Sequence, residues 1–260
     1  MNQTVLRYKT LLFYVFTFVI SWISWLLMSW VYDGGELSPV VYIFSSLGGL
    51  GPLLSLVILE KLSQKAISVR DILGQIRIRK AERPWWFLPA IFALPLITIL
   101  GNVGYVLLGR EEVFRLIKPG PDELGISVVL VMIIHFVASL VTSPLFEEPG
   151  WRGFALGNLQ SRFGRELGSL MVGLLWWVWH QPMNLPFGIQ PTVHSFLFMI
   201  AASFMIDSLF NLSGRNLFTA MLAHQSMGTV FTFVYQGTDN WLQLGLLVGF
   251  VILLRFREVS

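Results

Sequence analysis

Long apolar runs are the feature that most restricts how this chain can fold. A helix that crosses a lipid bilayer needs about 20 mostly apolar residues. Eight segments approach that length, at residues 11–31, 38–59, 85–109, 126–158, 166–186, 192–211, 216–236 and 240–256. The fourth is interrupted and the last is short. The sequence therefore predicts an all-α, polytopic membrane protein with about eight transmembrane helices.

Composition and charge support the same fold class. The chain is 55% hydrophobic and 13% charged, with a mean hydropathy of +0.68, which is too apolar for a soluble domain with a charged surface. The net charge of +3 does not indicate nucleic acid as a partner, because the basic residues gather in short segments between apolar runs. No internal repeat stands out. We expect one transmembrane domain over residues 1–260, multi-pass in the cell membrane, with the lipid bilayer as its partner.

The distribution of Lys and Arg predicts the orientation. If the N-terminus is cytoplasmic, only Arg110, Arg115 and Lys118 fall outside, so both chain ends are expected in the cytoplasm. Residues 61–83 combine many basic residues with a short apolar side. This pattern predicts an interfacial cytoplasmic helix, and the motif-bearing core is expected over about 126–236.

Three charged residues lie where the bilayer should be. Glu147, Glu148 and Arg152 interrupt the fourth apolar run, and charges inside a membrane cost several kcal/mol unless they are paired or face a polar cavity. Glu148 and Arg152 are four residues apart, which predicts a salt bridge on one helix face. Pro149 predicts a kink or loosened turn. The alternative is that these are ordinary interfacial charges after a helix that stops at Phe146.

Histidines supply possible partners for Glu147. If the fourth and fifth runs form a helical hairpin that turns at residues 161–165, Glu147 and His180 are equidistant from the turn and lie at similar depth. His180 follows a run of tryptophans, where a histidine can also be a satisfied core residue. His224 lies about ten residues into a span that the chain enters from the cytoplasm. Because a helix rises 1.5 Å per residue, His224 is expected in the same half of the membrane as Glu147 and His180.

One carboxylate and two histidines favour hydrolysis. The carboxylate can act as a general base, one imidazole can share the proton and the second can steady an oxyanion. The same three side chains could instead bind a catalytic Zn²⁺ with an open position. The chain has no cysteine, so thiol catalysis and Cys-ligated zinc are excluded.

The sequence resembles the CAAX protease and bacteriocin-processing family of intramembrane peptidases, also called CPBP or Abi, which includes the type II CAAX prenyl endopeptidases. The family motif Glu-Glu-x-x-x-Arg is matched by Glu147, Glu148 and Arg152. Its second motif is matched by Trp176 through His180. Its third motif, a His followed four residues later by Asn or Asp, is matched at His224 but has Gly228 at the last position. The resemblance covers residues 142–228.

This resemblance implies an intramembrane endopeptidase that cleaves a lipid-anchored or hydrophobic peptide or protein near the cytoplasmic leaflet. Glu147 and His180 would activate water, and His224 would help to hold the oxyanion. No cofactor is required under this mechanism, although Zn²⁺ held by Glu147, His180 and His224 is an open alternative. Gly228 favours a second class, a non-catalytic peptide-binding or bacteriocin self-immunity membrane protein. The implied catalytic set is Glu147, Glu148, Arg152, His180 and His224.

Overall fold

The protein is almost entirely helical. A computed structural model describes residues 3–35, 38–110, 114, 117, 127–235 and 239–259. Helices make up 81% of the structure, and the described ranges contain no strand beyond an isolated bridge between Ile117 and Val234. The all-α prediction is confirmed. The chain forms two compact units. The first consists of Met1–Ile76 and Leu145–Thr192, and the second of Arg77–Pro144 and Val193–Ser260. The expectation of one domain stays a prediction.

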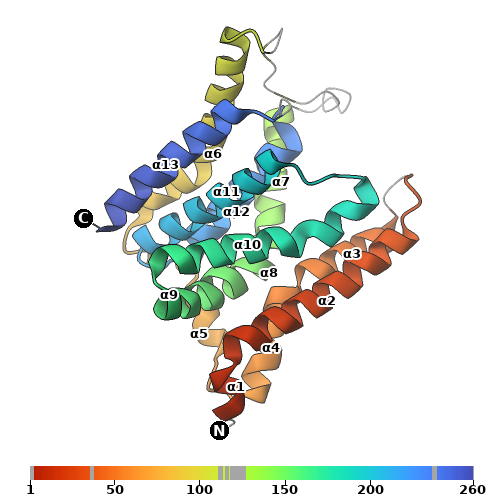
Figure 1. Cartoon of the computed structure of the whole chain (residues 1–260), viewed down its shortest axis with the longest axis vertical. Helices are drawn as coiled ribbons and strands as arrows, with labels where there is room; N and C mark the ends of the chain where they lie inside the picture. The colour runs from red at the N-terminus through yellow and green to blue at the C-terminus, as the bar shows by residue number, and fades with distance from the viewer. Residues whose placement is uncertain are drawn as a thin grey trace. The chain divides into compact units, whose positions relative to one another are not determined.

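The first unit is organised around the long helix α2. This helix packs against α3, α4 and α10, while the π-helix η3 packs against α4, α9 and α10. Figure 1 shows α2, α3 and α4 in red and orange and α9 and α10 in green. The elements are α1 (Gln3–Arg7), α2 (Lys9–Val31), α3 (Pro39–Gly49), α4 (Gly51–Leu62), α5 (Val69–Leu73), α8 (Ser143–Glu148, in this unit from Leu145), η3 (Pro149–Leu156), α9 (Gly157–Phe163), α10 (Arg165–Asn184) and η4 (Leu185–Phe187).

The second unit is a bundle of longer helices. In it α6 packs on α12 and α13, α11 packs on the same two helices, and α7 packs on α12. Its elements are η1 (Pro84–Trp86), α6 (Phe87–Leu107), α7 (Val128–Leu140), α11 (Val193–Leu212), α12 (Leu217–Phe233) and α13 (Trp241–Val259).

Several helices are long and apolar enough to cross a membrane. Four meet this criterion, at Lys9–Val31, Pro84–Leu107, Val128–Phe163 and Val193–Leu212, and α3 with α4 form a fifth if this pair, bent by 50°, is one span. The protein is therefore a polytopic membrane protein. Helices α10, α12 and α13 occupy the other three predicted runs without meeting the criterion within the described residues, so the count of eight stays a prediction.

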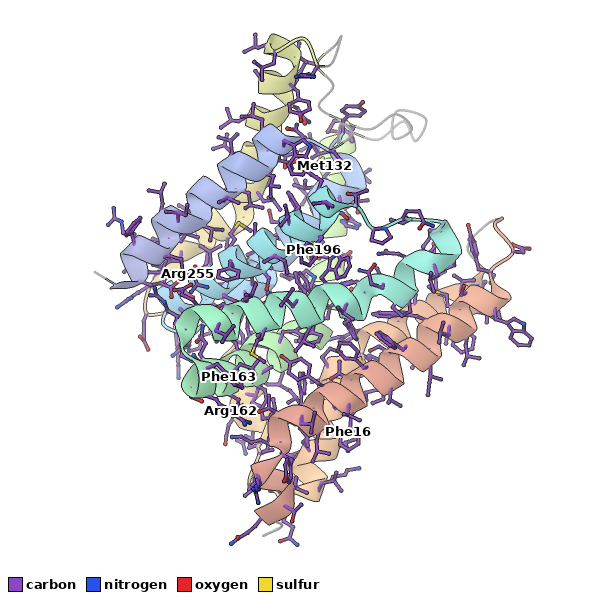
Figure 2. All side chains as sticks on the ribbon, in the orientation of Figure 1. Phe16, Met132, Arg162, Phe163, Phe196 and Arg255 are labelled. Carbon is purple, nitrogen blue, oxygen red and sulfur yellow. The ribbon has the colours of Figure 1, made fainter. Side chains whose placement is uncertain are left out.

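Large apolar side chains project outward from these helices, as Figure 2 shows for the side chains that it draws. On α7 none of the residues is buried, and Ile133, Ile134 and Val137 are each more than half exposed. On α2 the side chains of Leu11 and Ile23 are similarly exposed. Apolar surface of this extent is not stable in water. It fits a lipid environment.

The predicted interfacial helix over 61–83 is much shorter in the structure. Lys61 and Leu62 belong to the end of α4, and of the remaining residues only Val69–Leu73 is helical. After α4 the chain turns through the left-handed conformations of Gln64 and Lys65, which end the helix, and α5 stops at Gly74. The prediction of a helix over the whole segment is therefore wrong. Most of the predicted outer loop, with Arg115 and Lys118, lies outside the described residues.

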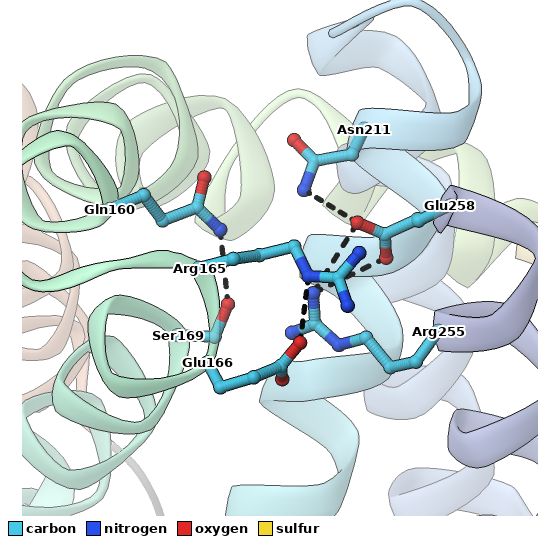
Figure 3. Close-up of polar contacts among 7 residues, drawn as sticks. All are labelled: Gln160, Arg165, Glu166, Ser169, Asn211, Arg255 and Glu258. Atoms are coloured by element: carbon cyan, nitrogen blue, oxygen red, sulfur yellow. Dashed lines mark hydrogen bonds and ion pairs between the residues drawn. The ribbon is translucent and has the colours of Figure 1, made fainter. Parts of the chain in front are cut away.

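The predicted helical hairpin is present. Helix α9 ends at Phe163 and α10 begins at Arg165, with Gly164 between them at φ +84°, a conformation that favours glycine. The helices touch closely, because a Cβ on Gly168 would lie 2.6 Å from the backbone nitrogen of Gln160. Figure 3 shows the hydrogen bond that Gln160 Nε2 donates to Ser169 Oγ across this hairpin, 3.1 Å long.

Candidate active site

The acidic motif lies at a change of helix type. Glu147 and Glu148 end α8, and Pro149 begins the π-helix η3, which continues to Leu156. Proline has no N–H to donate into the preceding turn, so the helix widens here instead of ending. The predicted loosened turn is confirmed. Single π-turns inside α-helices are frequent at functional sites.

The three charged side chains of this motif are buried. Glu148 and Arg152 are fully buried and Glu147 is 4% exposed. Arg152 Nη1 donates to Glu148 Oε1 at 3.1 Å, which confirms the predicted ion pair. The helix does not stop at Phe146, so the alternative of exposed interfacial charges is wrong. Because the pair lies in a low-dielectric interior, removal of either side chain would leave a buried charge without a counter-charge.

Trp176 connects the members of the site. Its Nε1 donates a 3.0 Å hydrogen bond to Glu147 Oε2, which orients that carboxylate. The guanidinium carbon of Arg152 lies 4.8 Å from the centre of its ring, a cation–π arrangement. Its backbone carbonyl accepts a 2.8 Å hydrogen bond from Nδ1 of His180. One buried tryptophan on α10 therefore contacts Glu147, Arg152 and His180.

Sequence reasoning did not assign a role to Trp176. A signal for it exists, because Trp176 and His180 are four residues apart and so share a face of α10. The hydrogen bond to Glu147 could not be read from that spacing, since it depends on how η3 packs against α10. Glu147 and His180, predicted to lie at similar depth, both contact Trp176. Glu147 binds its indole N–H, and His180 binds its backbone carbonyl.

His180 lies in an aromatic environment with a defined tautomer. Its ring is 4.7 Å from Trp179 and 5.1 Å from Trp176 in edge-on geometry, and stacks with Trp25 at 6.4 Å. A carbonyl oxygen only accepts hydrogen bonds, so Nδ1 carries a proton, and Nε2 is the ring atom that can exchange a proton with a bound water. Trp22 Nε1 donates to the carbonyl of Trp179 at 3.1 Å and holds α2 against α10. This arrangement makes Nε2 of His180 a candidate proton acceptor.

His224 belongs to the second unit. It lies in the middle of α12 and is 6% exposed. Gly228 follows one turn later, and a Cβ built on it meets only the side-chain amide of Gln225, at 3.9 Å, so a larger residue can be accommodated there. Two other histidines of this unit have partners elsewhere in it. His135 packs edge-on against Phe233, and His194 Nε2 donates a 3.0 Å hydrogen bond to the carbonyl of Asn240.

The zinc alternative needs more ligands than one unit supplies. In the part of the chain that the structure describes, neither unit gathers three His, Cys, Asp or Glu side chains at metal-binding distances. The first unit offers Glu147 and His180, whereas catalytic zinc usually has three protein ligands. The donor set of this unit does not by itself fit zinc, so we derive no step through a metal.

The chain is similar to a known protein family and to a curated protein. Residues 129–230 match the family model described as Type II CAAX prenyl endopeptidase Rce1-like, and this segment contains all five residues of the predicted catalytic set. This match supports the resemblance of the chain to the CAAX protease and bacteriocin-processing family. A curated relative, CAAX prenyl protease 2 of Methanococcus maripaludis, is 24% identical over 177 residues. The alignment covers 68% of this chain and 63% of that relative. The matched part of this chain therefore spans less than two thirds of the relative's length.

Gly150 sets how closely η3 approaches the first unit's other helices. A Cβ at this position would lie 2.7 Å from Cβ of Pro52 and 2.9 Å from Cζ of Phe13. We expect Gly150→Ala to destabilise the protein by about 1–3 kcal/mol, because the extra methyl overpacks a rigid contact. Thermal melting in detergent measures this effect. Gly49→Ala is the control, since its Cβ would have no neighbour within 4 Å; equal melting temperatures of the two variants would refute the packing argument.

Proposed function

We propose that this protein is an intramembrane endopeptidase in which Glu147 and His180 activate a water molecule. The observation that carries the proposal is the buried carboxylate of Glu147, oriented by Trp176, which also binds His180. The relative's name supports a prenylated peptide or protein as the substrate class. The positive-inside pattern favours cleavage near the cytoplasmic leaflet.

The proposed reaction uses a water molecule bound by Glu147 and by Nε2 of His180. Glu147 removes a proton as the water oxygen attacks the carbonyl carbon of the scissile bond, which gives a tetrahedral oxyanion. The resemblance to the family assigns the stabilisation of this oxyanion to His224. The C–N bond then breaks, and the leaving amine takes the proton from Glu147. Glu148 and Arg152 contact no reacting atom in this scheme and instead position the helix that carries Glu147.

A cleavage assay tests the proposal. The purified protein is incubated in detergent with an internally quenched CAAX-type peptide, with and without the prenyl group, and the products are identified by mass spectrometry. We expect cleavage of the prenylated peptide by the parent and none by the Glu147→Ala or His180→Ala variants. If both variants cleave as fast as the parent, the proposal fails.

The immunity or peptide-binding alternative is favoured by one residue, Gly228, where the family has Asn or Asp. We expect Gly228→Asn to raise kcat by up to about 10²-fold, because one oxyanion donor is worth about 10²–10³ in rate. Gly228→Ala is the control, since it adds the Cβ without the amide. The measurement is kcat for the quenched peptide. Equal activity of the two variants would show that an amide at position 228 does not act as an oxyanion donor. If the parent and both variants are all inactive, the result favours the non-catalytic class.

A further inference from the structure

A groove in the second unit lies outside the candidate active site. Its volume is about 530 Å³, within the usual range for small-molecule pockets. Five of its lining side chains are apolar and one is a guanidinium. They are Trp86, Phe250, Leu253, Leu254, Phe256 and Arg257.

The groove is lined by residues of α13 and by Trp86 of η1, the short 3₁₀ helix that leads into α6, and α6 packs antiparallel against α13. These helices approach closely at one end, where a Cβ on Gly101 would lie 2.7 Å from Cβ of Gln243. Small residues allow such close backbone contact in membranes. Gln243 Nε2 donates to Thr98 Oγ1 at 2.8 Å and fastens this end. The groove is at the opposite end of the same pair, where Trp86 precedes α6 and Arg257 lies in the last turn of α13.

The position of the groove along the span corresponds to the level of the lipid headgroups. Trp86 stands at the start of the span Pro84–Leu107, and tryptophan is enriched at membrane interfaces. The basic residues of segment 77–83 and of the last turns of α13 predict that this end faces the cytoplasm. Leu253 and Phe256 are 64% and 71% exposed, so the groove is open on its lipid side.

The two arginines near the end of α13 differ in their surroundings. Arg255 Nη1 lies 3.3 Å from Glu258 Oε1, a contact that Figure 3 shows, and its guanidinium carbon is 4.8 Å from the ring of Phe204. Arg257 also has a contact within the protein, but its side chain is exposed and lines the groove. The groove therefore combines an apolar wall with a cation at headgroup depth.

We propose that this groove binds an anionic phospholipid of the cytoplasmic leaflet. One acyl chain would lie along the apolar wall, and the phosphate would accept hydrogen bonds from the guanidinium of Arg257. Arg79 and Lys80, which are exposed and lie a few positions before Trp86 in the sequence, would add attraction for an anionic headgroup. The inference does not depend on the protein being a peptidase.

Lipid titration of the purified chain tests this site. The delipidated protein in detergent is titrated with phosphatidylglycerol or phosphatidylcholine of identical acyl chains, and native mass spectrometry counts bound lipid. We expect the parent to prefer phosphatidylglycerol. Arg257→Gln should weaken phosphatidylglycerol binding by about fivefold, the value of one basic residue at an anionic surface, and leave phosphatidylcholine binding unchanged. Leu253→Gln should weaken both lipids.

The control is Arg162→Gln, which removes the same charge from an exposed arginine of the first unit that packs on Phe163 (Figure 2). Melting temperatures confirm that each variant is folded. The site is refuted if the parent binds both lipids equally, if Arg162→Gln weakens phosphatidylglycerol as much as Arg257→Gln does, or if Leu253→Gln changes neither lipid. Displacement of phosphatidylglycerol by an equal concentration of glycerol 3-phosphate would also overturn it, because it would indicate a phosphate site without an acyl-chain site.

Discussion

Glu147→Gln is expected to lower kcat for peptide hydrolysis by about 10²–10⁴-fold, the usual contribution of a general acid–base residue. The amide keeps the size of the side chain, and its oxygen can still accept the hydrogen bond from Trp176 Nε1. It cannot take a proton from water. The melting temperature should therefore stay close to that of the parent while turnover is lost. Initial rates on the quenched prenylated peptide, with melting curves on the same samples, measure both quantities.

Glu166→Gln is the matched control for this variant. Glu166 is an exposed carboxylate of the same unit, 2.7 Å from Arg165 at the start of α10 (Figure 3). The same chemical change there should leave kcat unaltered. A Glu147→Gln protein that hydrolyses the peptide at the parental rate would show that Glu147 is not the base. Equal losses in the two variants would point to a general effect of charge.

Arg152→Met is expected to lower stability by about 3–5 kcal/mol, because it leaves the buried Glu148 without its cation. The fully buried position of both side chains gives water no access to compensate the carboxylate. The loss should appear as a lower melting temperature in detergent. Arg165→Met breaks an exposed pair and should cost less than about 1 kcal/mol.

The double variant Glu148→Gln, Arg152→Met separates pairing from packing. Removing both charges also removes the uncompensated carboxylate, and replacing a whole buried pair is often neutral. We expect the double variant to melt above Arg152→Met alone. If it melts lower, with the two losses simply adding, the side chains do not depend on each other and the ion pair is not what stabilises this turn.

The sequence alone predicts those parts of the site that depend on local spacing. The contact between Glu148 and Arg152 follows from a four-residue separation on one helix. The α9–α10 hairpin follows from the position of Gly164 between two apolar runs. The contact of Trp176 with Glu147 could not be predicted, because the residues are 29 positions apart and their meeting depends on helix packing.

Two other differences have physical causes. Residues 61–83 do not form one helix because the left-handed backbone at Gln64 and Lys65 ends α4 and separates it from the short helix α5, which stops at Gly74. Helix α12 does not qualify as a span because it has 17 residues, several of them polar. Most of its side chains, His224 and Gln225 among them, are buried inside the protein and do not need to be apolar enough for lipid.

The most direct test of the central claim is a double-mutant cycle on kcat with Glu147→Gln, His180→Ala and the combined variant. Residues that activate one water as a unit show strongly non-additive losses. We therefore predict that the combined variant is no slower than the slower single variant. Losses that multiply, with each residue contributing independently of the other, would contradict a joint role of Glu147 and His180 in activating water.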